Sequence, residues 1–106
     1  MFEDMRPAEW LQRKESDELW QLLDVRESWE IEIAAIDGAV CIPMGEVPLR
    51  LDELDPMLPI AVLCHAGHRS AQVAALLDQS GFVTVVNIEG GIDAWAQDID
   101  SAIPRY

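Results

Sequence analysis

The sequence predicts an α/β domain built on a parallel sheet with helices on both faces. Short apolar runs alternate with segments of helical pattern along the chain, and short loops separate them. The run over residues 59–64 is continuously apolar, without the alternation of a strand that has one face in water. At 106 residues, the chain is long enough for one hydrophobic core and too short for two. We therefore expect a single domain that spans residues 1–106.

In the first half of the chain, segments with helix signals alternate with segments with strand signals. Pro7 fits the first turn of a helix, Ser28 is a suitable N-cap, and Pro43 stops a strand. The expected helices cover residues 6–11, 28–36 and 47–54, and the expected strands cover residues 21–25 and 38–43.

The second half repeats the same order around the continuous apolar run. Apolar residues cover much of the circumference of the segment 70–79, and Gly81 stands where a glycine commonly ends a helix. Residues 82–87 form another apolar run, and Gly90 and Gly91 open a final helix. The expected order is strand 59–64, helix 70–79, strand 82–87 and helix 90–99.

The net charge of −13 is the strongest feature of the composition. A protein this acidic repels the phosphates of a nucleic acid, and we therefore expect no nucleic-acid partner. Such a charge can also serve solubility alone. No apolar run approaches the roughly 20 residues that span a bilayer. The first residues also lack the basic-then-apolar order of a signal peptide. We expect a cytoplasmic protein without a membrane partner.

The chain has only two cysteines, too few for a disulfide framework. Cys41 lies in an apolar strand and is expected to be a buried, inert thiol, with a redox role against Cys64 as the minor alternative. Cys64 ends the run 59–64 and precedes a helix. With His65 and His68 it offers metal ligands, but no further partner has a suitable spacing, so we expect no metal site.

The turn after Cys64 has the features of an anion-binding loop that contains a nucleophile. In parallel α/β sheets, ligands bind beyond the carboxyl ends of the strands, where the next helix begins. If the following residues wrap around the sulfur, their N–H groups and the positive end of the helix favour thiolate over thiol. Gly67 tolerates the positive φ of a tight turn, and Arg69 adds positive charge. A cysteine that ends a buried strand is also commonly structural, so the residues alone leave both interpretations open.

The segment from Cys64 to Ser70 resembles the active-site loop of the rhodanese-type sulfurtransferases, which has Cys, two residues, Gly, one residue, Arg and Ser. Further segments similar to motifs of that family occur in the same order at residues 22–27, 36–43 and 87–95. The resemblance implies a three-layer α/β/α rhodanese-like fold with a central parallel sheet of about five strands. It implies Cys64 as the catalytic nucleophile, and a substrate-binding loop of His65, Ala66, Gly67, His68, Arg69 and Ser70.

The resemblance also implies the reaction and the partners. Cys64 attacks the outer sulfur of a small anionic donor such as thiosulfate, keeps that sulfur as a persulfide, and passes it to cyanide, a thiol or a protein. No metal or organic cofactor takes part. Some single rhodanese domains are fused behind adenylyltransferases that activate sulfur-carrier proteins, so a protein that donates or accepts sulfur is expected as well.

Two other functions remain open on the same fold. Cysteine-dependent phosphatases and arsenate reductases are the first. Such phosphatases place five residues between Cys and Arg, whereas four separate Cys64 from Arg69, and the shorter turn favours a terminal sulfur over a phosphate. The second is a binding module without catalysis. Such modules usually lack the cysteine, which this chain keeps.

Supporting roles fall to side chains near the loop. Arg69 either contacts the donor anion or turns inward and pairs with a carboxylate, for which Asp24 at the end of its strand is the candidate. Arg26 is expected in a surface ion pair with Glu27. His65 and His68 are expected to line the mouth of the site, where their charge varies near neutral pH.

The aromatic residues receive structural roles with one exception. Trp95 is expected either to wall the site or to anchor the core. Trp10, Trp20 and Trp29 are expected to pack the N-terminal elements. The tail, residues 103–106, is expected only to dock on the domain.

Overall fold

The computed structural model describes residues 1–16 and 19–106 and confirms the predicted α/β fold. Within these residues, five strands form one sheet in the order β1-β5-β4-β2-β3, and every pair is parallel. The continuously apolar strand β4 lies at the centre, as its burial on both faces requires. The strands are β1 (Glu3–Met5), β2 (Gln21–Asp24), β3 (Val40–Cys41), β4 (Ile60–Leu63) and β5 (Val85–Ile88).

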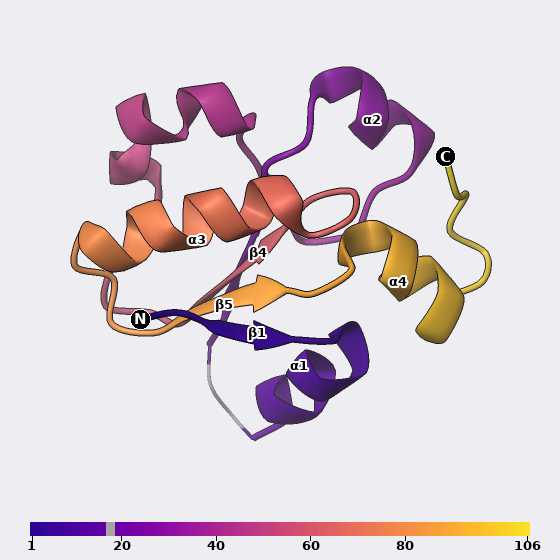
Figure 1. The fold of residues 1–106 in the computed structure, drawn as a ribbon, viewed down its shortest axis with the longest axis horizontal. Helices are drawn as coiled ribbons and strands as arrows, with labels where there is room; N and C mark the ends of the chain where they lie inside the picture. The colour runs from indigo at the N-terminus through magenta and orange to yellow at the C-terminus, as the bar shows by residue number, and fades with distance from the viewer. Residues whose placement is uncertain (17–18) are drawn as a thin grey trace.

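Helices cover both faces of this sheet (Figure 1). The α-helices are α1 (Pro7–Lys14), α2 (Ser28–Ile33), α3 (His68–Gln79) and α4 (Gly91–Asp98), and the 3-10 helices are η1 (Met44–Leu49) and η2 (Leu51–Glu53). Residues of α3 and η1 pack on one face, and residues of α1 and α4 pack on the other. The predicted three-layer arrangement is therefore confirmed.

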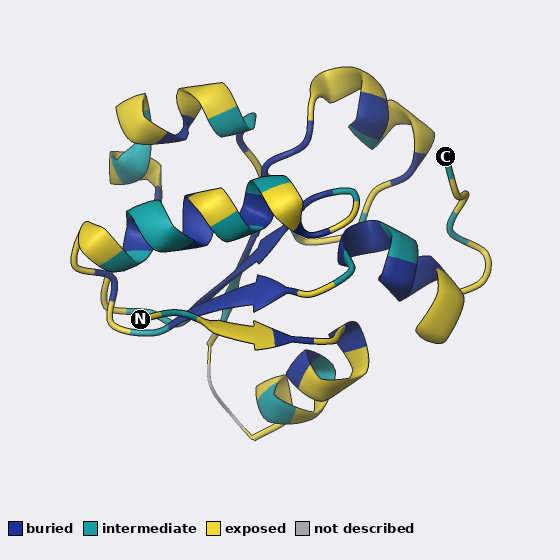
Figure 2. Cartoon of the chain, in the orientation of Figure 1, coloured by how far each residue is buried: buried dark blue, intermediate teal, exposed yellow. Residues whose placement is uncertain are grey.

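The core consists of two hydrophobic clusters, one on each face of the sheet. Successive side chains of a strand point to opposite faces, so Leu22 and Leu23 of β2 belong to different clusters. Leu77 of α3 packs in the cluster that contains Cys64, and Trp10 of α1 packs in the other. Figure 2 shows the buried central strands between helices whose outer sides are exposed.

Some elements differ from the sequence predictions. β1 is absent from the predicted elements because only one of its residues, Met5, is buried, so the strand lacks an apolar pattern. The predicted helix 47–54 is wrong: the segment lies in two short 3-10 helices, and Pro48 inside the first cannot donate the N–H that an α-helix needs. The predicted strand 38–43 is reduced to two paired residues at the edge of the sheet.

The two helices beside the predicted loop begin differently from the prediction. Glu27, not Ser28, caps α2: its side chain accepts a backbone N–H of the first turn, while the Glu30 side chain accepts the backbone N–H of Glu27. Helix α3 begins at His68, two residues before the predicted start, because Gly67 at φ +101° makes the turn into the helix.

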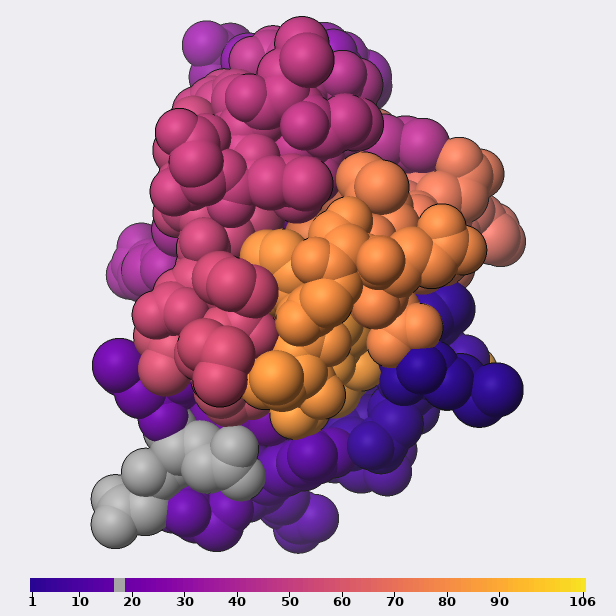
Figure 3. Space-filling model, turned by 90° about the vertical axis from the view of Figure 1, so that its left-hand side faces the viewer, coloured from indigo at the N-terminus to yellow at the C-terminus, as the bar shows by residue number. Residues whose placement is uncertain are grey.

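The Cys64 loop lies at the carboxyl ends of the strands, next to the first turn of α3 (Figure 1). Figure 3 shows another face of the molecule, where residues of η1 and η2 and of the turns at residues 55–58 and 79–84 lie near the N-terminal residues. These turns are joined by a hydrogen bond from Val83 N–H to the Pro56 carbonyl at 3.0 Å. In the part of the chain that the structure describes, no helix is long and apolar enough to cross a membrane.

Candidate active site

The loop between β4 and α3 closes tightly around the Cys64 sulfur. Cys64 is 1% exposed, and its Sγ accepts the backbone N–H of Gly67 at 3.1 Å. Gly67 has φ +101°, and a Cβ there would lie 3.1 Å from the backbone nitrogen of Gly90. The N–H groups of the first turn of α3 follow directly, and they have no acceptor within the helix. The loop thus combines a buried sulfur with backbone donors and the positive end of a helix dipole.

The first turn of helix α4 is hydrogen-bonded to the backbone of this loop. The backbone N–H of Ile92 donates to the Cys64 carbonyl at 2.9 Å, and that of Asp93 donates to the His65 carbonyl at 3.1 Å. Gly91 has φ +60°, and a Cβ at this position would collide with both carbonyl oxygens. A glycine at the first position of α4 is therefore required for the helix to approach the loop.

Arg69 turns inward and pairs with Glu30 of α2. Its Nη1 and Nη2 donate to Glu30 Oε1 and Oε2 at 2.6 and 2.8 Å, and the Glu30 side chain is 2% exposed. The hydrogen bonds from Arg69 lower the pKa of Glu30 from 4.5 to about 2, against the opposing effect of burial. The prediction that Asp24 pairs with Arg69 is wrong, since Glu30 occupies that position.

Asp24 instead pairs with Arg26, and both side chains are buried. Arg26 Nε donates to Asp24 Oδ1 at 2.9 Å and Nη2 donates to Oδ2 at 2.7 Å. Arg26 also donates to the carbonyls of Glu30 and Ala34 at 3.3 and 2.7 Å. The predicted surface pair of Arg26 with Glu27 is therefore wrong. The buried pair ties the end of β2 to α2, the helix that carries the partner of Arg69.

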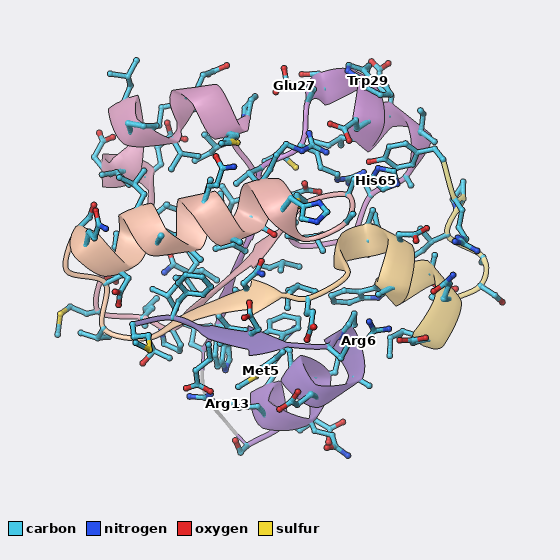
Figure 4. All side chains as sticks on the ribbon, viewed as in Figure 1. Met5, Arg6, Arg13, Glu27, Trp29 and His65 are labelled. Atoms are coloured by element: carbon cyan, nitrogen blue, oxygen red, sulfur yellow. The ribbon has the colours of Figure 1, made fainter. Side chains whose placement is uncertain are left out.

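Aromatic rings from distant segments meet at the mouth of the loop. The His65 ring is stacked on Tyr106, with centroids 4.1 Å apart, and Trp29 meets Tyr106 edge-on. The Tyr106 hydroxyl donates to Glu30 Oε2 at 2.8 Å and accepts from Arg26. Figure 4 shows the labelled His65 side chain beside this region, below α2 with its labelled Trp29. The tail is thus bonded to the groups that hold Arg69.

Trp29 is 59% exposed, so the prediction that it packs the N-terminal elements is wrong. Trp10 and Trp20 do pack there, with ring centroids 5.8 Å apart. Trp95 is 7% exposed, and its ring centroid lies 5.9 Å from that of Trp10. Of its two predicted roles, Trp95 therefore has that of a core anchor and not that of a wall of the site. His65 is half-buried under Tyr106, whereas His68 is exposed.

Cys41 differs from its prediction as a buried thiol. The residue is exposed on β3, so that prediction is wrong. Partial desolvation and the nearby Asp24 carboxylate raise the pKa of the Cys41 thiol. The Cys41 thiol is therefore accessible to reagents, but its raised pKa disfavours the thiolate form.

A second polar contact joins Cys64 to Ser70 of α3, and through Ser70 to Asn87 of β5. Cys64 Sγ donates to Ser70 Oγ at 3.2 Å, and Ser70 Oγ donates to Asn87 Oδ1 at 2.5 Å. Asn87 is 4% exposed and its Nδ2 donates to Asp4 Oδ1 at 2.9 Å. Among the described residues, no group of three His, Cys, Asp or Glu side chains is arranged to hold a metal ion.

Comparison with known proteins identifies this arrangement of sheet, loop and helix. The rhodanese-like domain family matches residues 7–98. The chain belongs to this family. A crystal structure of a rhodanese-like domain protein from Staphylococcus aureus has 28% sequence identity and a TM-score of 0.83, and the match covers 99% of each chain.

Curated relatives share the rhodanese-like domain at higher identity. A sulfurtransferase of Allochromatium vinosum is 38% identical over 76 residues, which cover 72% of this chain and 71% of the relative. The rhodanese-like/PpiC domain-containing protein 12, chloroplastic, of Arabidopsis thaliana is 43% identical over 90 residues. That match covers 81% of this chain and 30% of the Arabidopsis protein, so this chain spans less than a third of that relative.

Four residues around the site of this rhodanese-like domain have no role at the site in the sequence prediction: Asp4, Glu30, Asn87 and Tyr106. Asn87 has a visible signal, since it is the one amide within the apolar run Val85–Ile88 and a buried amide needs partners. Glu30 has the weaker signal of a capping box with Glu27. Asp4 and Tyr106 have no signal in the sequence, because they come near the Cys64 loop only when the chain folds.

Proposed function

We propose that this rhodanese-like domain is a sulfurtransferase that holds sulfane sulfur as a persulfide on Cys64. The observation that carries the proposal is the position of the sulfur, whose Sγ lies 3.1 Å from the Gly67 nitrogen at the start of α3. The family match and the relative named a sulfurtransferase support the same activity. The proposal assigns residues 65–70 to the binding loop and the two pairs Asp24–Arg26 and Glu30–Arg69 to its support.

In the loading step, ionised Cys64 attacks the outer sulfur of a small anionic donor such as thiosulfate. A new S–S bond forms to Sγ, the S–S bond of thiosulfate breaks, and its electron pair leaves with sulfite. The terminal sulfur of the persulfide then carries the negative charge. The N–H groups in the first turn of α3, which have no acceptor within the helix, stabilise that charge as the donors of an oxyanion hole stabilise a negatively charged oxygen.

In the unloading step, a thiophilic acceptor attacks the terminal sulfur. With cyanide the products are thiocyanate and the Cys64 thiolate, and a thiol acceptor receives the same sulfur as a persulfide of its own. A protein acceptor or donor in the cytoplasm would meet a surface of net charge −13, so we propose that it has a basic docking face.

The bonding of Arg69 favours sulfur transfer over phosphate hydrolysis. A phosphate in the loop carries more charge than a persulfide and needs a guanidinium aimed at it. Both terminal nitrogens of Arg69 instead donate hydrogen bonds to Glu30, at 2.6 and 2.8 Å, and the Glu30 carboxylate neutralises the guanidinium charge. With only four residues between Cys64 and Arg69, the loop has less length to encircle a phosphate.

Mass spectrometry after thiosulfate treatment tests this function. We expect the peptide that contains Cys64 to gain the mass of one sulfur atom, and cyanide to remove it. Cys64→Ser should show no such gain and no thiocyanate production. Cys41→Ser is the matched control and should keep both, because Cys41 lies on β3 away from the loop.

Other outcomes would support the alternatives. Turnover of an aryl phosphate without persulfide formation would replace sulfur transfer by phosphatase chemistry. A chain with neither activity would be a binding module.

A further inference from the structure

A line of hydrogen bonds connects buried Cys64 with the edge strand β1. It runs from Cys64 to Ser70 of α3, then to Asn87 of β5 and to Asp4 of β1, with donor–acceptor distances of 3.2, 2.5 and 2.9 Å. Ser70 is 0% exposed and Asn87 is 4% exposed, whereas Asp4 is an exposed residue. The register of the parallel strands places Asp4 directly opposite Asn87. The line therefore crosses from the nucleophile to the surface through three elements.

Asp4 sets the direction in which the donors point along this line. A carboxylate only accepts hydrogen bonds, so the amide nitrogen of Asn87 faces Asp4, and the same nitrogen lies 3.4 Å from the Gly67 carbonyl. The amide oxygen is left for Ser70, whose single hydroxyl proton points to it. Ser70 can then only accept from Cys64, and this requires a protonated thiol.

We propose that Asn87, oriented by Asp4, positions the Ser70 hydroxyl so that it stabilises the resting thiol of Cys64. When Cys64 ionises, its proton passes to solvent and the sulfur becomes an acceptor. Ser70 can donate to that sulfur only if it turns its proton away from Asn87, which leaves a buried amide oxygen without a partner. Asn87 and Asp4 are thus positioning residues that act through Ser70. The inference rests on the proposed function because Cys64 is its nucleophile.

Other titratable or charged groups around Cys64 act on the same equilibrium and stay unchanged in the test. They come from the loop, from α2 and α3, from the end of β2 and from the start of α4. These groups are His65, His68, Asp93, the Arg69–Glu30 pair and the Asp24–Arg26 pair. A shift seen in a variant of Asn87 or Asp4 is therefore not caused by their replacement.

The test measures the pH at which the rate of Cys64 alkylation by iodoacetamide is half its maximum. The parent is the Cys41→Ser variant, in which Cys64 is the only thiol. Asn87→Leu removes the acceptor and keeps a similar shape, so Ser70 is free to donate to the thiolate. We expect this midpoint to fall by about one pH unit, which is roughly tenfold in ionisation. In a Ser70→Ala background, Asn87→Leu should have no effect, because Asn87 acts through the hydroxyl.

A second variant does not disturb the core. Asp4→Asn places an amide that can also donate, so Asn87 can turn its nitrogen toward Ser70 and release the hydroxyl proton for Cys64. We expect a smaller fall of the midpoint. Glu3→Gln is the matched control: it removes the same charge from the neighbouring residue of β1, whose side chain points to the other face of the sheet, and the midpoint should not move.

Three results would overturn the inference. The first is that Asn87→Leu and Asp4→Asn both have the same alkylation midpoint as the parent. The second is that Asn87→Leu still shifts the midpoint in the Ser70→Ala background. If Asn87→Leu does not fold, equal midpoints for Asp4→Asn and Glu3→Gln are the third. The proposed function fails separately, because a parent that forms no persulfide can still show the predicted alkylation shifts.

Discussion

At the scale of single residues, Arg26 has the most complete set of partners near the site. All five of its N–H donors have acceptors: the two oxygens of Asp24, the carbonyls of Glu30 and Ala34, and the Tyr106 hydroxyl. A buried charge is tolerated only with such pairing. The flat, forked guanidinium matches this geometry, and an ammonium group does not.

We expect Arg26→Lys to lower the free energy of unfolding by about 2–4 kcal/mol, because Lys leaves buried acceptors without donors. Urea unfolding at pH 7 measures this. Arg50→Lys is the matched control, since Arg50 pairs with Glu46 and Glu53 on the surface, and it should leave the unfolding midpoint unchanged. An equal loss in both variants would contradict a special role for the buried network.

At the scale of elements, the Cys64 loop is held between two helix starts. Gly67 at φ +101° precedes the first residue of α3, and the first turn of α4 has N–H groups that donate to the Cys64 and His65 carbonyls. Gly91 makes that second contact possible, because a Cβ would occupy the place of both oxygens. The loop is thus shaped by packing as well as by its own sequence.

Gly91→Ala tests the contact between α4 and the loop. We expect a loss of stability well above the about 1–2 kcal/mol of positive-φ strain, because the collision adds to that strain, together with loss of sulfur transfer. Gly38→Ala is the matched control: Gly38 has φ +85° but no atom within 4 Å of a new Cβ, so only the strain remains. Urea unfolding and the persulfide measurement compare the two. Similar losses would show that the contact contributes nothing.

At the scale of the whole molecule, acid sensitivity follows from one buried carboxylate in a chain of net charge −13. The pKa of Glu30 falls from 4.5 to about 2 because Arg69 donates to it. A group whose pKa is lower in the folded state stabilises the fold above its unfolded pKa, and that contribution is lost as the pH falls from about 4.5 to about 2. The shift corresponds to about 3 kcal/mol at neutral pH.

We expect the stability difference between the parent and Glu30→Gln to be largest at neutral pH and to shrink steadily between pH 4.5 and pH 2. Urea unfolding across that range measures it. Glu32→Gln, an exposed position on the same helix, is the control and should follow the parent at every pH. A Glu30→Gln difference that stays constant with pH would mean that the ion pair does not couple to folding.

Local patterns in the sequence determined the order of strands and helices and the position of Cys64. The apolar run 59–64 favours a central strand, and a glycine and a helix start follow it within a few residues. Strand, turn and helix are therefore indicated by neighbours in the chain. The edge strands β1 and β3 and the 3-10 helices lack such signals, so the sequence does not predict their presence or their extent.

Only the tertiary structure decided which side chains surround the sulfur. Asp24 and Glu30 are both carboxylates beside the loop, and the partner of Arg69 is the one 39 residues away on α2. The link from Cys64 through Asn87 to Asp4 likewise joins residues up to 83 positions apart in the chain. Such contacts depend on the directions in which side chains leave packed elements, and these directions are fixed only when the sheet and helices assemble.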